Sequence, residues 1–171
     1  EEHSWIPTVS QLINDIYHAN LPIFGVCFGH QLIAQALGGY VEKSIKGWGL
    51  GLHTYEIDNK TDYMGNLPKE LTLNICHQDQ VQKVPEGAKV YAKSDFCENA
   101  GFYIKDKVLT MQAHPEFLVD FTEALLKARR DVTIPKEFVD PALLKLEAEP
   151  NSVQSNQFAE TIRQFFLRIV Y

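Results

Sequence analysis

The amino-acid sequence predicts an α/β domain in which a layered sheet carries flanking helices. Two observations support this class. Apolar residues recur with helical spacing at both ends of the chain, and the middle is a series of short apolar runs separated by turn residues. The chain has 171 residues, of which 45% are hydrophobic. This length and composition fit one domain with a sizeable core, so residues 1–171 are treated as a single domain.

The first expected elements are a helix, a strand and a second helix. Ser4 is a candidate N-cap of the first helix, and Pro7 is tolerated in its first turn. The continuous apolar run "LPIFGV", residues 21–26, predicts a strand buried on both faces. Residues 30–37 predict a helix that ends at Gly38 and Gly39. The helical spacing of the first element comes from Trp5, Val9, Leu12, Ile13 and Ile16.

The centre of the chain predicts strands, and the last third predicts helices. Turn residues separate the runs 40–45, 49–57, 71–76, 89–94, 101–105 and 107–112. Helices resume near Leu118, and residues 148–156 form a loop before the last one. Ser152 or Ser155 is its candidate cap. Its apolar stripe consists of Phe158, Ile162, Phe165, Phe166 and Ile169.

The predicted strand at 21–26 needs neighbours on both sides, yet only one helix precedes it. Because an α/β sheet normally begins with a strand, we expect the domain to be incomplete at its N-terminus, with strands missing from this chain.

Composition narrows the class of function. The net charge is -6, and the most basic stretch, "KARR" at 127–130, is short, which argues against a nucleic-acid partner. The apolar runs are too short for a membrane crossing. Three cysteines without a framework spacing favour a reducing, cytoplasmic setting with at least one free thiol.

The segment "GVCFG" around Cys27 has the pattern of a nucleophile elbow, in which a strand turns sharply into a helix. Gly25 and Gly29 would let the strand and the helix approach each other. The helix N-terminus would favour the thiolate, and the N–H of Phe28 would face the oxyanion of an acyl substrate. The alternative is that Cys27 is a small buried residue between two turn glycines.

His114 is the candidate base for this thiol. Pro115 favours an extended conformation at His114, and residues two apart in an extended chain point to the same side. Glu116 can therefore orient the imidazole, as the carboxylate of a triad does. We expect activity to fall at acid pH as His114 becomes protonated. The alternative is a histidine in a surface loop.

The other histidines give weaker signals. His30 is expected to start the helix after the elbow. His77 either lines the site through its backbone or is a turn residue satisfied by Asp79. A metal site would need Cys27, His30, Cys76 and His77, but these have no pairwise ligand spacing, so no metal is expected. His3, His18 and His53 are interpreted as surface residues, and Cys97 as structural.

Four segments together resemble the class I glutamine amidotransferase family, and most closely its stand-alone members related to the GMP synthase glutaminase domain. They are "PIFGVCFGHQLIAQALGG" (22–39), "KGWGLG" (46–51), "HQDQVQKVPEGAKVYAKSD" (77–95) and "VLTMQAHPEF" (108–117). The resemblance is clear from Trp5 to Glu116 and looser to the end of the chain. It implies the flavodoxin-like fold of that family.

The resemblance implies that Cys27 is the nucleophile, His114 the base and Glu116 its orienting carboxylate. Such enzymes hydrolyse the side-chain amide of glutamine through a γ-glutamyl thioester and release ammonia for an acceptor, here unknown. Gln31 matches a residue that contacts the substrate, and the backbone around His77 matches a segment that receives it. The alternative for Gln31 is a side chain that faces solvent. No cofactor is implied.

The chain departs from the family in one respect. The family's second oxyanion-hole N–H comes from a glycine loop that would precede residue 1. Losing one such donor costs about 3–4 kcal/mol of transition-state stabilisation, so a protein of these residues alone is expected to be a poor enzyme.

Two alternatives to glutamine hydrolysis stay open. One is a γ-glutamyl peptide hydrolase on the same fold, which would use the same catalytic residues. The other is a catalytically idle regulatory module. In all cases the expected partner is a small-molecule substrate, with no nucleic acid and no membrane.

Overall fold

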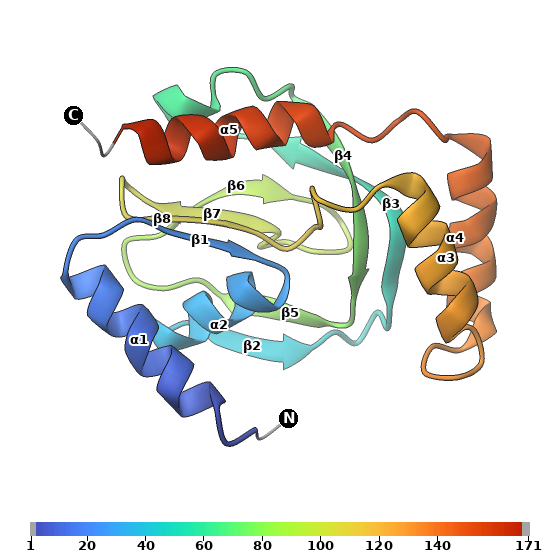
Figure 1. Ribbon diagram of the computed structural model, residues 1–171, viewed down its shortest axis with the longest axis horizontal. Helices are drawn as coiled ribbons and strands as arrows, with labels where there is room; N and C mark the ends of the chain where they lie inside the picture. The colour runs from blue at the N-terminus through green and yellow to red at the C-terminus, as the bar shows by residue number, and fades with distance from the viewer. Residues whose placement is uncertain (1–2, 169–171) are drawn as a thin grey trace.

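A mixed six-stranded sheet with helices on its faces forms the centre of the molecule, in a computed structural model that describes residues 3–168 (Figure 1). The strand order is β1-β8-β7-β6-β3-β4, and a separate two-stranded ribbon joins β2 to β5. The strands are β1 (Ile23–Val26), β2 (Tyr40–Lys43), β3 (Gly49–Ile57), β4 (Glu70–His77), β5 (Asp79–Lys83), β6 (Lys89–Lys93), β7 (Gly101–Ile104) and β8 (Val108–Met111). The predicted α/β class with flanking helices is confirmed.

The helices cover the sheet on two faces and at one end (Figure 1). They are α1 (Ile6–His18), α2 (Phe28–Ala36), α3 (Val119–Arg129), α4 (Lys136–Ala148) and α5 (Ser155–Leu167), with a short 3-10 helix η1 (Asp62–Met64). Helices α1 and α2 lie on one side of the sheet, α5 on the other, and α3 and α4 beside β3. None of these described helices is long and apolar enough to cross a membrane.

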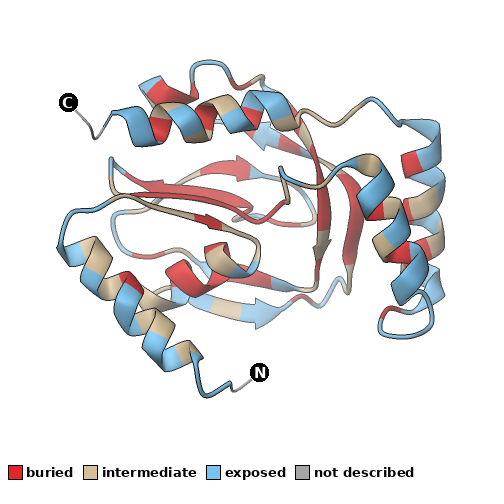
Figure 2. Cartoon of the chain, viewed as in Figure 1, coloured by how far each residue is buried: buried red, intermediate tan, exposed pale blue. Residues whose placement is uncertain are grey.

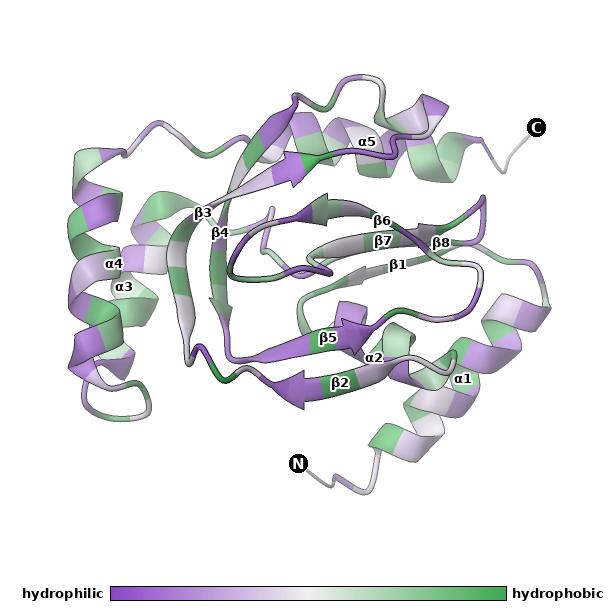
Figure 3. Cartoon of the chain, turned by 180° about the vertical axis from the view of Figure 1, so that it is seen from behind, coloured by the Kyte–Doolittle hydropathy of each residue, from purple (hydrophilic) through white to green (hydrophobic). Residues whose placement is uncertain are grey.

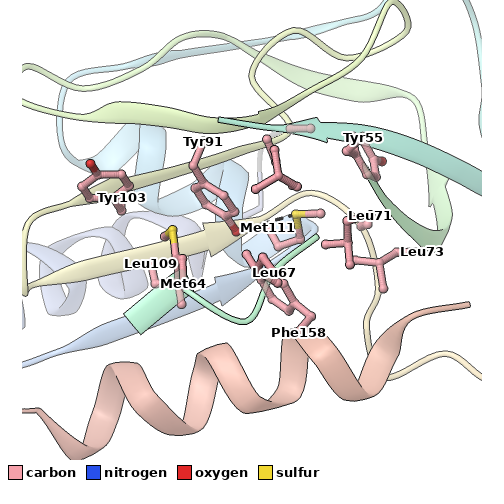
Figure 4. Close-up of a cluster of buried hydrophobic side chains, with 14 of the residues drawn as sticks. Tyr55, Met64, Leu67, Leu71, Leu73, Tyr91, Tyr103, Leu109, Met111 and Phe158 are labelled. Atoms are coloured by element: carbon pink, nitrogen blue, oxygen red, sulfur yellow. Dashed lines mark hydrogen bonds between the residues drawn. The ribbon is translucent and has the colours of Figure 1, made fainter. Parts of the chain in front are cut away.

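Three hydrophobic clusters hold the layers together, and buried positions concentrate in the sheet (Figure 2). In the largest, Phe158 points from α5 toward Met111 and Leu67 (Figure 4). A second cluster packs Ile13 and Ile33, from α1 and α2, against the other face. The third joins β3 to α3 and α4. Apolar burial of this kind, about 25 cal/mol per Å², is the main force that fixes the helices on the sheet.

The predicted N-cap residues of two helices are wrong. The N-cap of α1 is Trp5, not Ser4, and it makes no side-chain capping bond. Helix α5 begins at Ser155 with Gln154 as its N-cap, so neither predicted serine caps it. Pro7 lies in the first turn of α1, as predicted. Of the predicted stripe of α5, Ile169 lies outside the described residues.

The strand predictions are correct in position but incomplete. The prediction that β1 is buried on both faces is wrong: only Gly25 is buried, because β1 is the outermost of the six strands in the described sheet. Strand β5 was not predicted. Its residues are mostly hydrophilic, as are those of its partner β2 (Figure 3), and it pairs with β2 instead of entering the main sheet.

Candidate active site

The turn at Cys27 joins the end of β1 to the start of α2. The backbone of Cys27 has φ 50° and ψ -104°, and a positive φ is strained for a residue with a side chain. Its N–H donates to the carbonyl oxygen of Met111 at 2.8 Å, which continues the pairing of β1 with β8. This is the sharp strand-to-helix turn that the sequence predicts, and it leaves the Cys27 thiol partly exposed.

The two elbow glycines differ in what they do. A Cβ placed on Gly25 would lie 2.5 Å from Cδ1 of Ile33 and 2.8 Å from the carbonyl atoms of Gly29, so Gly25 is required where β1 meets α2. A Cβ on Gly29 would meet no atom within 4 Å. The prediction that both residues must be small is therefore wrong for Gly29. Only its backbone lies close to the strand.

Phe28 is the first residue of α2. The first N–H groups of a helix have no partner within the helix, so that of Phe28 is free to meet an anion beside Cys27. Its side chain is half-exposed and packs edge-on against Trp5, with ring centroids 5.6 Å apart. The role of the Phe28 N–H in an oxyanion hole stays a prediction.

His114 meets both predicted neighbours. Nδ1 of its ring lies 2.6 Å from Oε1 of Glu116, and the Cys27 thiol lies near enough to the ring to act on its pKa. The N–H of His114 donates to the carbonyl oxygen of Asn74 at 2.8 Å, which ties this loop to β4. The ring of Phe117 stacks on the imidazole, with centroids 3.9 Å apart and planes 9° apart. The imidazole is thus held on three sides.

These contacts change the charge of the imidazole. Burial acts to lower the pKa of His114, but hydrogen bonds to Cys27 and Glu116 outweigh burial and raise the pKa to about 9. Burial acts to raise the pKa of Glu116, and the hydrogen bond with His114 lowers it overall. His114 therefore carries a proton at neutral pH in the free protein. The expectation that activity falls at acid pH as His114 becomes protonated stays a prediction, and the raised pKa moves that protonation to higher pH.

Gln31 does not face solvent. The residue is 8% exposed, and its Nε2 donates to the carbonyl oxygen of Asp79 at 2.7 Å and to Oε1 of Gln112 at 3.1 Å. The solvent-facing alternative is therefore wrong. Both hydrogens of the Gln31 amide nitrogen are used within the protein, so its Oε1 is the amide atom left for a ligand.

His77 is buried at the end of β4. Its Nδ1 lies 3.1 Å from the carbonyl oxygen of Asp79, so the turn contact with Asp79 is present, through the backbone. Burial lowers the pKa of His77 to about 4, so the ring is neutral. A carbonyl only accepts hydrogen bonds, so Nδ1 bears the proton and Nε2 is an acceptor, buried without a partner. A role in substrate binding stays a prediction.

Comparison with known proteins identifies the family. The sequence model "Glutamine amidotransferase class-I" matches residues 3–127. The chain belongs to the class I glutamine amidotransferase family.

Relatives of several kinds share this family likeness. Gamma-glutamyl peptidase 3 of Arabidopsis thaliana is 31% identical, over 87% of this chain and 63% of the peptidase. One subunit of the glutamine-hydrolysing GMP synthase of Methanocaldococcus jannaschii is 38% identical, over 65% of this chain and 59% of its own length. A Saccharomyces cerevisiae relative, named "Putative glutamine amidotransferase", is 34% identical over 98% of this chain and 66% of its own length. The chain spans less than two thirds of these relatives' length, 59–66%.

The fold agrees with this assignment. The crystal structure of a glutamine amidotransferase from Thermotoga maritima superposes with a TM-score of 0.80 at 22% identity, over 96% of this chain and 70% of that one. A glutamine amidotransferase from Methylobacillus flagellatus gives 0.74, over 98% of this chain and 71% of that one. The predicted class I glutamine amidotransferase fold is confirmed.

A cavity of about 930 Å³ adjoins the elbow of this amidotransferase domain. Phe28 and Gln31 line it on the side of α2, and the charged residues Glu42, Lys43 and Asp79 line it on the side of the β2–β5 ribbon. Cys27 is not part of its lining, so the cavity lies beside the sulfur and does not enclose it. Across residues 3–168, no group of three or more His, Cys, Asp or Glu side chains is arranged to hold a metal ion.

Sequence reasoning missed three residues around the amidotransferase elbow. Gln112 is fully buried, and its Nε2 donates to the Cys27 sulfur at 3.6 Å. Asn74 holds the His114 loop through its carbonyl oxygen and, through Nδ2, donates to the carbonyl of Phe117 at 2.9 Å. Phe117 stacks on the imidazole. Gln112 and Phe117 stand next to the "AHPE" motif in the sequence, but no spacing rule marks them.

His53 is half-buried and Cys97 is fully buried. Burial lowers the pKa of His53 to about 4, and its ring packs against Phe96, so the surface interpretation is wrong. Cys97 is buried, and burial raises the pKa of its thiol to about 12, in keeping with a structural residue.

Proposed function

We propose that this chain hydrolyses the side-chain amide of glutamine to glutamate and ammonia, through a γ-glutamyl thioester on Cys27. Family membership and the peptidase relatives support a hydrolase activity. The observation that carries the proposal is the grouping of three side chains: Glu116 hydrogen-bonds the His114 ring, and the Cys27 thiol lies near enough to that ring to raise its pKa. A thiol, an imidazole and an orienting carboxylate in that order are the groups that nucleophilic acyl transfer requires.

The first half of the proposed reaction forms the thioester. The thiolate sulfur of Cys27 attacks the amide carbon, and the electron pair of the carbonyl bond moves onto oxygen. This oxyanion faces the N–H of Phe28 at the start of α2. The carbon–nitrogen bond then breaks, and the imidazolium of His114 gives its proton to the departing nitrogen, which leaves as ammonia. The raised pKa of His114, about 9, suits this step because the proton is already in place at neutral pH.

The second half releases glutamate. Neutral His114 takes a proton from a water molecule, whose oxygen attacks the thioester carbon. The carbon–sulfur bond breaks, Cys27 leaves as the thiolate, and His114 keeps the proton, which restores the starting pair. Glu116 accepts the hydrogen bond from Nδ1 throughout and supports the charged ring.

A second candidate is hydrolysis of a γ-glutamyl peptide by the same residues. The likeness to Gamma-glutamyl peptidase 3, and the cavity that lies beside the elbow, favour it. The two activities differ only in the leaving group, ammonia or an amino acid. A third candidate, the catalytically idle module, predicts that Cys27 has no special reactivity.

The deciding experiment compares initial rates of glutamate release from glutamine and from a γ-glutamyl dipeptide. Cys27→Ala is the inactive control, and Cys76→Ala is the matched control because Cys76 is another partly buried free thiol. A tenfold preference, about 1.4 kcal/mol, decides between the two substrates. Absence of turnover of both substrates, together with labelling of Cys27 by a γ-glutamyl electrophile that does not exceed that of Cys76, would support the idle module.

The cellular compartment is also part of the proposal. The thiols of Cys27, Cys76 and Cys97 are all free, and a nucleophilic thiol must stay reduced to act, so we place the protein in a reducing compartment such as the cytoplasm. The acceptor of the ammonia would be a partner protein or its substrate.

A further inference from the structure

A chain of buried amides leads to the Cys27 sulfur. Gln112 follows β8 and is fully buried, and its Nε2 lies 3.6 Å from Sγ of Cys27. Its Oε1 accepts a hydrogen bond from Nε2 of Gln31 at 3.1 Å. The same Nε2 of Gln31 donates to the carbonyl oxygen of Asp79 at 2.7 Å. The chain therefore runs from a backbone carbonyl through two side-chain amides to the nucleophile.

The direction of every bond in this chain is fixed by one backbone carbonyl. The oxygen of Asp79 can only accept, so Gln31 must turn its NH2 group toward it. That NH2 group also faces Gln112, so Gln112 must present its oxygen to Gln31. The NH2 group of Gln112 is then left for the sulfur. The oxygen of Asp79 is itself held in place, since Nδ1 of His77 also donates to it at 3.1 Å.

We propose that Gln112 donates the hydrogen bond that stabilises the Cys27 thiolate, and that Gln31 is a positioning residue that aims the Gln112 amide. The inference rests on the proposed function only in taking Cys27 as the nucleophile. A hydrogen bond to an anion is stronger than one to a neutral group, and burial keeps water from competing for it. The Gln112 amide is thus a donor to the sulfur that is separate from the imidazole of His114.

This role differs from packing alone. An apolar residue of the same length at position 112 would fill the same space and leave the fold intact, but it would give the sulfur no N–H. The expected signature is therefore a change in how the reactivity of Cys27 depends on pH, with no matching change in thermal stability.

The test measures the rate of alkylation of Cys27 by iodoacetamide between pH 4 and 10, resolved by peptide mass spectrometry. Gln112→Met removes the donor and keeps the length of the side chain. Gln31→Leu leaves the Gln112 amide free to rotate. Gln80→Leu is the matched control, because Gln80 is also buried and its Nε2 donates to the carbonyl oxygen of Phe96, away from the sulfur.

We expect the profile of Gln112→Met to move to higher pH by about one unit, which lowers the rate about tenfold on the acid side. Gln31→Leu should lower the alkylation rate of Cys27 on the acid side about threefold, and Gln80→Leu should leave this rate unchanged. A profile of Gln112→Met that overlays that of the unmodified protein would overturn the proposal. The deeply buried thiol of Cys97 serves as the unreactive internal reference.

A measurement on the unmodified protein covers the case in which Gln112→Met fails to fold. The side-chain amide signals of Gln112 in a nitrogen–proton NMR spectrum should shift as Cys27 titrates, and Cys27→Ala should abolish that shift. Gln112 amide signals that do not shift as Cys27 titrates would refute the hydrogen bond. Because neither measurement uses glutamine, a protein with the expected profile but no turnover would disprove the proposed function and leave this inference standing.

Discussion

The close approach of β1 and α2 at Gly25 gives the sharpest prediction on the fold of the site. In Gly25→Ala the new methyl group would lie 2.5 Å from Cδ1 of Ile33 and 2.8 Å from the carbonyl carbon and oxygen of Gly29. Comfortable carbon contacts are about 3.5–4.0 Å. The end of the Ile33 side chain can rotate away, but the backbone of Gly29 cannot move without shifting the first turn of α2 by about 1 Å.

The expected cost follows from that geometry. Inserting a methyl group into a tightly packed site destabilises a protein by about 1–3 kcal/mol. A shift of about 1 Å in the turn that carries Cys27 and the Phe28 N–H should also lower turnover about 10²-fold. Equilibrium unfolding in urea measures the first effect, and a melting temperature lowered by about 2–4 °C per kcal/mol provides a check.

Gly29→Ala is the control for this prediction. Its methyl group would meet no atom within 4 Å, and the residue lies in the first turn of a helix, where alanine is favoured over glycine by about 0.5–1 kcal/mol. The free energy of unfolding of Gly29→Ala should therefore equal or exceed that of the unmodified protein. If Gly25→Ala proves as stable as Gly29→Ala, the close contact of strand and helix is wrong.

Three further predictions concern the titrating groups. In Glu116→Gln the pKa of His114 should fall from about 9, and turnover should fall about 10²-fold. NMR titration measures the pKa, and rate assays measure turnover. An unchanged pKa of His114 would contradict the role of the carboxylate. In Phe117→Leu the pKa of His114 should also fall, because the stacked ring stabilises the imidazolium, and no change would show that the stack only packs. The free energy of unfolding should be greatest near pH 6.5. As the pH falls from 6.5 toward 4, the free energy of unfolding should decrease, because histidines whose pKa is lowered in the folded protein take up protons only in the unfolded protein. As the pH rises from 6.5 toward 9, the free energy of unfolding should also decrease, because the stabilisation from protonated His114 is lost. Denaturant curves from pH 4 to 9 test this, and a flat acid side would refute it. These histidines are the buried His30, with a pKa of about 3, the buried His77 and the half-buried His53, both with pKa values of about 4.

Local sequence signals predicted the parts of the site that depend on backbone geometry. The elbow follows from a small residue before Cys27 and a helical pattern after it, and both are properties of neighbouring residues. The contact of Glu116 with the His114 ring follows from Pro115, which fixes the chain between them. Such features need no knowledge of the tertiary fold, so a pattern in the chain is enough to predict them.

The features that the sequence did not predict depend on distant partners. Strand β5 has few apolar residues and exists because β2 pairs with it. The half-buried state of β1 comes from its place at the edge of the described sheet. Gln112 reaches the sulfur only because β8 lies beside β1, and the raised pKa of His114 depends on the thiol of Cys27. Each of these is decided by an element far away in the sequence.

The register of one strand pair therefore positions the residues to which the proposed function assigns the chemistry. Of the strand pairs described, only β1 and β8 run parallel, so both end at the same edge of the sheet. Val26 pairs with Met111, and the next N–H, that of Cys27, donates to the carbonyl oxygen of Met111. The residues that follow each strand then face each other, Cys27 on one side and Gln112 and His114 on the other. A slip of one residue would turn these side chains to opposite faces, because side chains alternate along a strand. The pairing of β1 with β8 thus positions the sulfur, its amide donor and its imidazole together.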